Sequence, residues 1–586
     1  MGLALVAALA IVVIQNRKSP APISPPQSTS ATAPGKSIAV LPLQNLSPDP
    51  ANAFFADGVQ EDILTDLSQI RELIVISRTS TLGYKDTTKN LRQIGQELGV
   101  RYLVEGSVRR AGDQVRVTVQ LIDATNDEHL WAQNYDRKLD DIFAIQSAVA
   151  RDIAGQLQAA ISPEEAARIE RRPTDNLKAY EYYVKARQLI EVGGATRGDE
   201  KIALLEQAVA LDPDFAEAWA QLAVESIYWW RVDRKRNDPA LLARAEEALA
   251  NARRLAPDLG NTYYAEAMVR ANRDGDIAVF ARVMRKALDA DPSFDYARYW
   301  VATHLAMSGN LDEAQPHFES VSRSNPSFAA ANMGLVSVYL QRGLFDQARA
   351  LIRKNMERTG DNGIWRERLA ETDYLESGNR QAYVVAMKGI SSFAETPRGK
   401  VWLALQSRDY EKALLHLRDN PKIGPREYNA GYFPEFELQT ASLMSALVAF
   451  QMGDANKART EADEAGKYME GVVEKDQLEA SSYLSSLIIC DAFAGDRERM
   501  EEHIAQVRNL TGSGFSHIYQ SAFEMHIAIA QLVQGDNDAA IETLTRASKL
   551  TGGRFLGREL ELCFIFDRLH SDPRFQALLT ADPTRP

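Results

Sequence analysis

The spacing of apolar residues changes along the chain and divides it into segments of different expected structure. An apolar run lies within residues 1–16, and a Pro-, Ser- and Ala-rich stretch covers 17–35. Short apolar runs then alternate with helix-period segments over 36–161, whereas only the helix period continues after residue 178. The pattern predicts a flexible linker, an α/β domain with a mixed sheet and covering helices, and a long all-α region.

Within residues 36–161, the order of elements is that of an α/β domain. Residues 38–41, 73–76 and 102–108 are runs typical of buried strands, and Pro42 ends the first of them. Apolar residues at three- and four-residue steps predict helices over 54–67, 91–98 and 142–157. A turn at 111–114 between β-branched runs predicts a hairpin, and 129–135 adds a strand.

Four prolines mark a repeat in the helical region. Pro213, Pro257, Pro292 and Pro326 stand in the phrases LDPDF, LAPDL, DADPSF and RSNPSF, at spacings of 44, 35 and 34 residues. A period near 34 resembles the tetratricopeptide repeat, whose helix pairs stack into a superhelix. The resemblance predicts a regular array over 178–360. Glycine turns farther on predict divergent helical repeats and a terminal cap over 361–586, and 162–177 is expected to be a connector.

A second resemblance lies in the α/β segment. The stretches SIAVLPLQNLSPDP and LGVRYLVEGSVRRAGDQVRVTVQLIDA look like the TolB-like amino-terminal domain. In that family the domain commonly stands between a membrane segment and tetratricopeptide repeats, often downstream of a class III adenylate cyclase domain or a winged-helix DNA-binding domain. Neither module is recognisable in this sequence, and the resemblance implies no catalytic residues.

Composition and motifs narrow the possible functions. With 45% hydrophobic and 25% charged residues the chain is of globular type. Its 67 basic and 80 acidic residues give a net charge of −13, which disfavours nucleic-acid binding. Two cysteines supply neither a disulfide framework nor a metal site. Because phosphate-loop, H-E-x-x-H and nucleophile-elbow motifs are also missing from the sequence, we expect no enzyme activity, cofactor or metal.

The amino-terminal apolar run suggests a location. Arg17 and Lys18 follow the run, and no positive charge precedes it, which favours an uncleaved membrane segment over a secretory signal or a buried or disordered stub. We therefore expect an inner-membrane anchor. The family pattern favours a periplasmic location for the folded part, whereas the two charges favour the cytoplasmic side.

Two groups of residues are candidates for binding. Arg78, Ser80, Arg109 and Arg110 follow predicted strands and could meet at one sheet edge, where α/β domains often bind ligands, although a solvated turn is the simpler interpretation. The insertion that lengthens the first repeat spacing holds the second group, aromatic residues beside arginines, as in interface anchors. These are Trp229, Trp230, Arg231 and Arg234. The alternative is a longer helix packed on the α/β domain.

These observations favour a non-enzymatic, membrane-tethered scaffold or sensor. Its superhelical groove would bind a protein or peptide partner, the amino-terminal segment would contact the membrane, and nucleic acid is not an expected partner. One alternative is that the chain is the sensory or regulatory portion of a longer or split signalling protein, such as an adenylate cyclase or a transcriptional regulator. Another is an enzyme with an unrecognised site in the α/β domain. The sequence does not define the partner or the oligomeric state.

Overall fold

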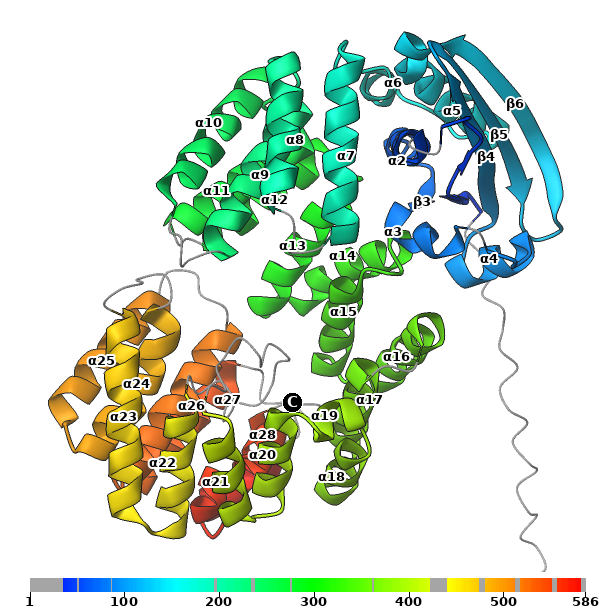
Figure 1. The fold of residues 1–586 in the computed structure, drawn as a ribbon. Helices are drawn as coiled ribbons and strands as arrows, with labels where there is room; N and C mark the ends of the chain where they lie inside the picture. Colours follow the sequence, from blue (N-terminus) through cyan, green and yellow to red (C-terminus); the bar gives the residue numbers. More distant parts are fainter. Residues whose placement is uncertain are drawn as a thin grey trace, which may run out of the picture.

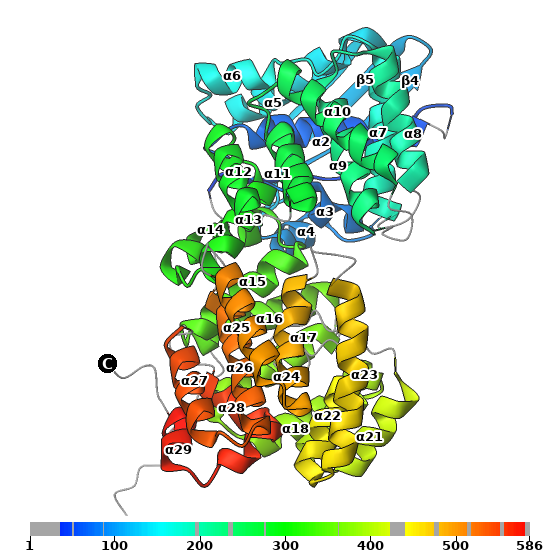
Figure 2. The ribbon, with the colours of Figure 1, turned by 90° about the vertical axis from the view of Figure 1, so that its left-hand side faces the viewer.

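The chain forms two lobes, one above the other (Figure 1, Figure 2). The upper lobe contains the sheet and the first helix pairs, and the lower lobe contains the carboxyl-terminal helices. The computed structural model describes residues 35–49, 52–85, 87–193, 198–232, 238–274, 277–360, 363–421, 440–473, 480–511, 517–550 and 556–580.

The sheet of the upper lobe has a parallel half and an antiparallel half. Its strand order is β3-β1-β4-β5-β6, with β2 (Gln44–Asn45) paired to β4. Strands β1 (Ser37–Val40), β3 (Ile74–Ile76) and β4 (Tyr102–Ala111) are parallel, and β5 (Gln114–Asp123) and β6 (Glu128–Lys138) continue antiparallel. The predicted hairpin turn is confirmed: Ala111 pairs with Gln114, and Gly112 adopts a φ of 63° that glycine accepts without strain.

Helices cover both faces of the sheet. On one face, α2 (Ala53–Ser68) and α5 (Ile142–Gln156) pack on the apolar residues of β1, β3, β4 and β5. From β6, the same buried cluster includes Tyr135. On the other face, α4 (Leu91–Leu98) covers only β1, β3 and the start of β4, in a smaller cluster that includes Ala39, Ile76 and Leu103. Helix α4 has the bounds predicted from the sequence, with a capping box at Asn90 before it and Gly99 in the left-handed conformation after it. The α/β architecture is confirmed.

Antiparallel helix pairs continue from the α/β domain down to the start of the lower lobe (Figure 2). They are α7 (Leu177–Gly193), α8 (Gly198–Leu211), α9 (Ala216–Val232), α10 (Pro239–Leu255), α11 (Gly260–Asp274), α12 (Ile277–Ala290), α13 (Asp295–Met307), α14 (Leu311–Ser324), α15 (Ala329–Gln341) and α16 (Phe345–Thr359). The proline phrases form the turns between pairs. Backbone hydrogen bonds Phe294 N to Asp291 O (3.1 Å) and Phe328 N to Asn325 O (3.0 Å) close two of them. The repeat prediction is confirmed.

The lower lobe continues the helix pairs and then returns on itself. Its helices are α17 (Gly363–Ser377), α18 (Arg380–Lys388), α19 (Ser391–Ala394), α20 (Pro397–Gln406), α21 (Tyr410–Asp419), α22 (Ala441–Met452), α23 (Ala455–Val473), α24 (Ala480–Ala494), α25 (Arg497–Thr511), α26 (His517–Val533), α27 (Asn537–Leu550), α28 (Leu556–Leu562), η6 (Phe564–Leu569) and α29 (Pro573–Thr580). The buried Gln406 amide donates to Leu562 O (2.9 Å), and Tyr374 OH donates to Arg558 O (2.9 Å). The terminal segment therefore packs against α17 and α20.

The expected membrane anchor is not supported. No helix in the described part of the chain is both long and apolar enough to cross a bilayer. Even α23, with 19 residues, carries charges such as Lys457 and Glu461, because a helix in a packed pair keeps one polar face. The segment 1–16 that prompted the expectation, and residues 17–34, lie outside the described residues. The prediction of an inner-membrane, periplasmic protein is therefore withdrawn.

Candidate functional site

The segment after β3, where a ligand edge was predicted, is hydrogen-bonded to the helical array. Ser77 N–H donates to Ser324 O (2.8 Å), and Ser80 Oγ donates to Asn325 Oδ1 (3.2 Å). Ser327 N–H in turn donates to Ser80 Oγ (3.1 Å). Ser324 is the last residue of α14, and Asn325 and Ser327 lie in the turn between α14 and α15. This edge of the sheet is thus an intramolecular contact between the α/β domain and the array.

The predicted arginines of this edge lie in different environments. Arg78, in the short helix α3 (Arg78–Thr81), is buried, and burial lowers the pKa of its guanidinium. Arg110 pairs with Glu181 of α7 (2.7 Å) and lies over the ring of Phe55, 5.5 Å from its centroid. Arg109 precedes it on β4, so its exposed side chain points to the opposite face of the sheet. The structure does not bring Arg109 and Arg110 to a common site.

The aromatic candidates pack within the array. Trp229 of α9 lies so close to Gly198 of α8 that a Cβ there would be 1.9 Å from the indole, and it meets Tyr228 edge-on at 5.8 Å. Trp230 packs against the same apolar core, and Arg231 is exposed. Arg234 lies outside the described residues. The tryptophans therefore contribute to packing inside the upper lobe.

Helix α7 joins the α/β domain to the array, which the sequence analysis did not predict. Val184 of α7 approaches α2 at Gly58. The approach requires glycine, because a Cβ at this position would lie 2.9 Å from Val184 Cγ1. Tyr180 packs edge-on against Phe143 of α5, with ring centroids 4.9 Å apart. We call this contact of α7 with α2 and α5 the α7 interface. Its α7 residues follow one helix side: Tyr180, Glu181, Val184, Lys185, Arg187 and Gln188.

A network of polar groups lies within the α7 interface and centres on Asp62 of α2. Its carboxylate accepts hydrogen bonds from Tyr180 OH and from the amide of Gln146 (3.0 Å). Arg187 approaches the same carboxylate at 3.5 Å and pairs with the neighbouring Glu61. Three elements, α2, α5 and α7, therefore share one half-buried carboxylate.

Burial changes the acidity of this network. Desolvation raises the pKa of Asp62 to about 7, although the hydrogen bonds from Tyr180 and Gln146 oppose the shift. Asp66, one helical turn further along α2, has its pKa raised to about 8 by burial and by the charge of Asp62. Burial also raises the pKa of Glu217 on α9, which Arg171 partly offsets. Burial at the α7 interface therefore favours the neutral form of these carboxyl groups.

Apolar packing extends across the α7 interface without a break. One cluster of buried residues runs from Ile38 and Val104 of the sheet, through Ile63 of α2, to Val184 of α7 and Val269 of α11. A core this continuous makes the α/β domain and the first helix pairs a single folded body. The predicted boundary at 161 therefore falls inside one packing unit.

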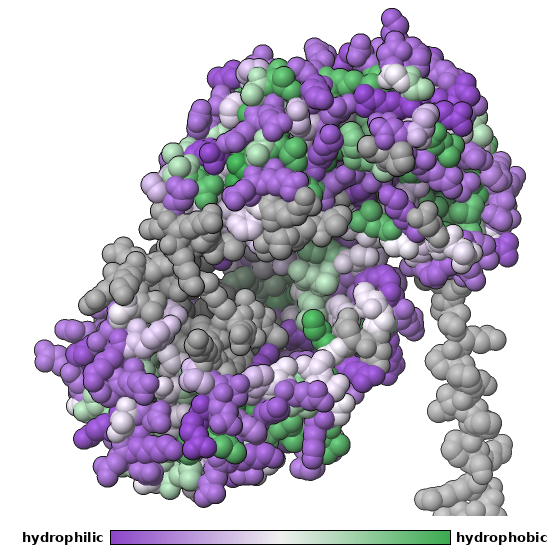
Figure 3. Space-filling view, viewed as in Figure 1, coloured by the Kyte–Doolittle hydropathy of each residue, from purple (hydrophilic) through white to green (hydrophobic). Residues whose placement is uncertain are grey.

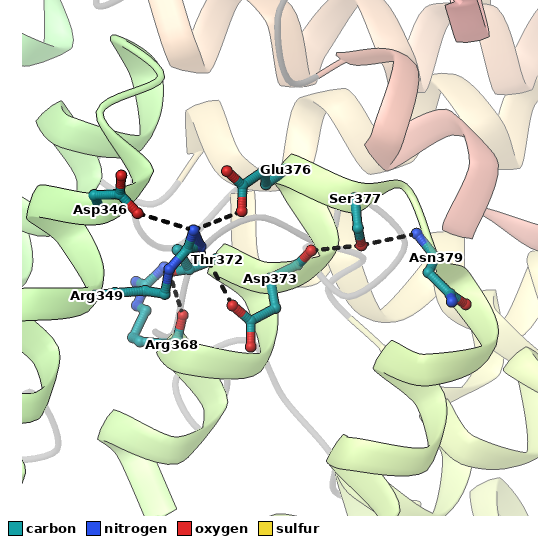
Figure 4. A network of polar contacts seen from close by, with 8 residues as sticks. All are labelled: Asp346, Arg349, Arg368, Thr372, Asp373, Glu376, Ser377 and Asn379. Atoms are coloured by element: carbon teal, nitrogen blue, oxygen red, sulfur yellow. Dashed lines mark hydrogen bonds and ion pairs between the residues drawn. The ribbon is translucent and has the colours of Figure 1, made fainter. Parts of the chain in front are cut away.

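The two lobes meet at α16 and α17, where an arginine joins several acidic groups. Figure 4 shows Arg349 of α16 between Asp346 and two residues of α17. Its guanidinium lies 3.3 Å from Asp346, 3.4 Å from Asp373 and 2.6 Å from Glu376. The buried cluster here is small and includes Ile352. These ion pairs therefore contribute to holding the lobes together.

The described residues contain no group of three or more His, Cys, Asp or Glu side chains suited to a metal ion. The acidic groups of the α7 interface are engaged by Tyr, Gln and Arg donors instead. These contacts join α2, α5 and α7 through hydrogen bonds and an ion pair.

Comparison with known families gives two matches. The model of the HilA/YgeH-like transcriptional regulator second domain matches residues 34–151, and a tetratricopeptide repeat model matches 305–364. The TolB-like resemblance is thus not confirmed, whereas the repeats are. The first match covers most of the α/β domain, and the second covers the array from the end of α13 to the start of α17.

A curated relative extends the comparison. The chain is 42% identical to the putative adenylate cyclase 3 of Rhizobium meliloti (strain 1021) over 217 residues, which are 36% of this chain and 37% of the relative. The chain therefore spans little more than a third of that protein. The aligned length also exceeds the segment 34–151, so the match includes residues beyond it.

Solved structures align with the chain at low sequence identity. A tetratricopeptide repeat protein from Parabacteroides merdae is 14% identical and covers 42% of this chain and 92% of its own, with a TM-score of 0.30. The human IFIT1 dimer with m7Gppp-AAAA is 12% identical and covers 87% and 98%, also with a TM-score of 0.30.

Proposed function

We propose that this chain is the protein-binding, regulatory part of a signalling protein and performs no catalysis itself. The observation that carries the proposal is the apolar core that the sheet-covering helices share with α7 to α11. Because the two parts pack as one body, a partner on the array would act on the α/β domain without a flexible joint between them. The sequence identity with a putative adenylate cyclase supports the proposal that the signalling protein is a nucleotide cyclase.

The partner surface that we assign is the side of α13 and α15 bordering the hollow between the lobes. Figure 3 shows this hollow, with apolar atoms on its floor where Figure 1 places α13 and α15. The tetratricopeptide model matches this stretch. Two other helix surfaces are covered within the chain: α7 lies against α2, and the terminal segment packs against α17 and α20. Ser337 of α15 is half-buried, and we assign it to this surface.

The test uses the purified chain and the part of the Rhizobium relative that the chain does not match, produced separately. We expect the two to bind in calorimetry and the rate of cyclic AMP formation to change on mixing. Ser337→Arg places a long cation on the assigned surface, and we expect about a tenfold loss of affinity, whereas Gln347→Arg on the exposed side of α16 serves as the control. Absence of binding contradicts the cyclase setting, and equal binding by both variants contradicts the assigned surface.

A second setting is favoured by the match to a transcriptional regulator. In this setting the partner is a DNA-binding domain, and the α/β domain occupies the place of the regulator's second domain. The acidic chain would not contact DNA itself. A gel-shift assay with a DNA-binding domain of that regulator family is the test. We expect the chain to change the affinity of that domain for DNA, and an unchanged affinity argues against this setting.

A further inference from the structure

Strand β6 forms an open edge of the sheet. It is the last strand in the order β3-β1-β4-β5-β6, and it has 11 residues. Figure 1 shows it at the outer side of the upper lobe, and no other described strand pairs with this edge. The opposite edge differs, because α14 contacts β3 and Ser77 N–H, directly after β3, donates to Ser324 O (2.8 Å). The array therefore covers one edge of the sheet and leaves the other uncovered.

A long open edge strand is a template for pairing with another strand, and proteins usually shorten it, interrupt it with proline or cover it. Strand β6 contains no proline, and all its residues except Trp131 and Tyr135 are exposed. Its one irregularity is a bulge, where the register with β5 passes over Leu130. The stretch from Trp131 to Lys138 is regular, so it can accept a further strand.

The hydrogen-bond pattern shows which backbone groups face the open edge. Leu139 N–H, directly after β6, donates to Asp113 O (2.8 Å), and this pair continues the register of β5 and β6. In an antiparallel ladder bonded and non-bonded pairs alternate, so the odd-numbered residues over 131–137 bond to β5. The even-numbered residues direct their N–H and C=O groups to the open edge. These are Ala132, Asn134 and Asp136.

A second copy of β6 fits this edge, because the strand is self-complementary about Asn134. Opposite residues of an antiparallel pair point to the same face, so a two-fold axis between two copies must pass through a residue. With the axis at Asn134, Ala132 lies opposite Asp136 of the second copy, and Trp131 lies opposite Arg137. The guanidinium then meets an indole ring, which is a favourable cation–π pair, and no like charges lie opposite each other.

Both faces of β6 leave room for the second copy. Gln133 and Arg137 point to the face that α5 covers, yet both are exposed, so α5 does not extend over the edge. On the other face, Asp136 pairs with Arg116 of β5 (2.6 Å), and the small Ala132 opposite it does not disturb this pair. Arg137 donates to Asp136 O (2.9 Å), and a main-chain N–H of the second copy would replace this contact.

We propose that the open edge of β6 is a dimerisation surface, where two copies of this chain pair antiparallel about Asn134 and join their sheets. The two-fold axis is perpendicular to the joined sheet, so both copies have α2, α5 and the array on the same side of it. The dimer presents two arrays in a fixed relation to each other. This function goes beyond partner binding and does not depend on which partner the array takes.

Sedimentation equilibrium of the full chain tests whether it dimerises. We expect a reversible equilibrium in which the average mass rises from that of a monomer to twice that value as the concentration increases. A mass that stays monomeric contradicts the proposal. Growth beyond a dimer also contradicts it, because pairing about a two-fold axis is closed.

A proline at the axis tests whether β6 is the contact. Asn134→Pro removes an N–H that faces the open edge and leaves the bonds to β5 in place, so the fold should be kept. In the dimer the change removes two main-chain hydrogen bonds, one donated by each copy. We expect the dissociation constant of the dimer to rise on the order of thirtyfold. Asn134→Ala keeps the N–H and is the matched control; equal dimerisation by the two variants contradicts the proposal.

A cysteine at the axis tests the register and does not depend on the proline variant folding. Opposite residues of a bonded pair have Cα atoms about 5.5 Å apart, which suits a disulfide. On oxidation, Asn134→Cys should form a covalent dimer in a non-reducing gel. Asn126→Cys, at an exposed turn outside the paired stretch, should not, and the native Cys490 and Cys563 are buried. No covalent dimer of Asn134→Cys, or equal amounts from both variants, contradicts the proposal.

Discussion

Replacement of Gly58 by leucine should weaken the α7 interface directly. A Cβ at this position lies 2.9 Å from Val184 Cγ1, 3.3 Å from Val184 Cγ2 and 3.5 Å from the Tyr180 hydroxyl, so the further leucine atoms must displace α7. Gly155 on α5 is the matched control, because a Cβ there meets no atom within 4 Å. Both replacements gain helix propensity of up to ~1 kcal/mol, which cancels in the comparison.

The difference between the two variants therefore measures overpacking at the interface. Overpacking of this kind costs about 1–3 kcal/mol, so Gly58→Leu should be less stable than Gly155→Leu by that amount. Urea unfolding followed by circular dichroism gives the two free energies, and hydrogen exchange locates the loss in α2 and α7. If the two variants agree within about 0.5 kcal/mol, α7 does not pack on α2 as described here.

Two further substitutions test the lower lobe and the contact between lobes. Phe564→Ala removes a fully buried ring of the returning terminal segment and should cost about 3–5 kcal/mol in guanidinium unfolding, whereas Tyr468→Ala, at a side chain that is 59% exposed, should cost little. Arg349→Ala removes three ion pairs at one guanidinium that is 16% exposed, and should lower stability by about 1 kcal/mol in thermal unfolding. Arg497→Ala removes a single exposed pair with Glu501 and should have less than half that effect; equal losses contradict a special role for Arg349.

Local signals made most of the fold predictable. Residues a few positions apart determine the strand that ends shortly before Pro42, the hairpin turn at Gly112 and the turns at Pro292 and Pro326. Glycines such as Gly453, with a φ of 85°, likewise mark the turn inside a helix pair. The α/β and helical-repeat architecture follows from the sum of these signals.

The candidate site depended on contacts that join distant parts of the sequence. Val184 meets Gly58, and Gln406 donates to Leu562 O, yet neither residue shows its partner in its own neighbourhood. The apolar pattern of α7 is that of a repeat helix. It does not show whether the second face of this helix packs on another repeat or on the α/β domain. A signal was nevertheless present in α2, where Asp62 and Asp66 stand one turn apart beside buried residues such as Ile63. Acidic groups so close to a core indicate donors on another element.

The residues predicted to bind a partner instead contact other parts of the same chain. Arg110 and Ser80 do lie in contacts, but their partners are Glu181 and Asn325 of the same chain. Trp229 is packed on Gly198. Composition identifies residues that make interfaces, and it does not distinguish an interface within the chain from one with a partner.

Cutting the chain between the α/β domain and α7 tests the account most directly. A protease site is inserted after the exposed Arg172, in the segment between α6 (Pro163–Ile169) and α7, and the cleaved protein is run on a size-exclusion column. The shared core predicts that the two pieces elute together and separate only in denaturant. Separation of the pieces under native conditions would contradict the conclusion that the α/β domain and the first helix pairs form one body.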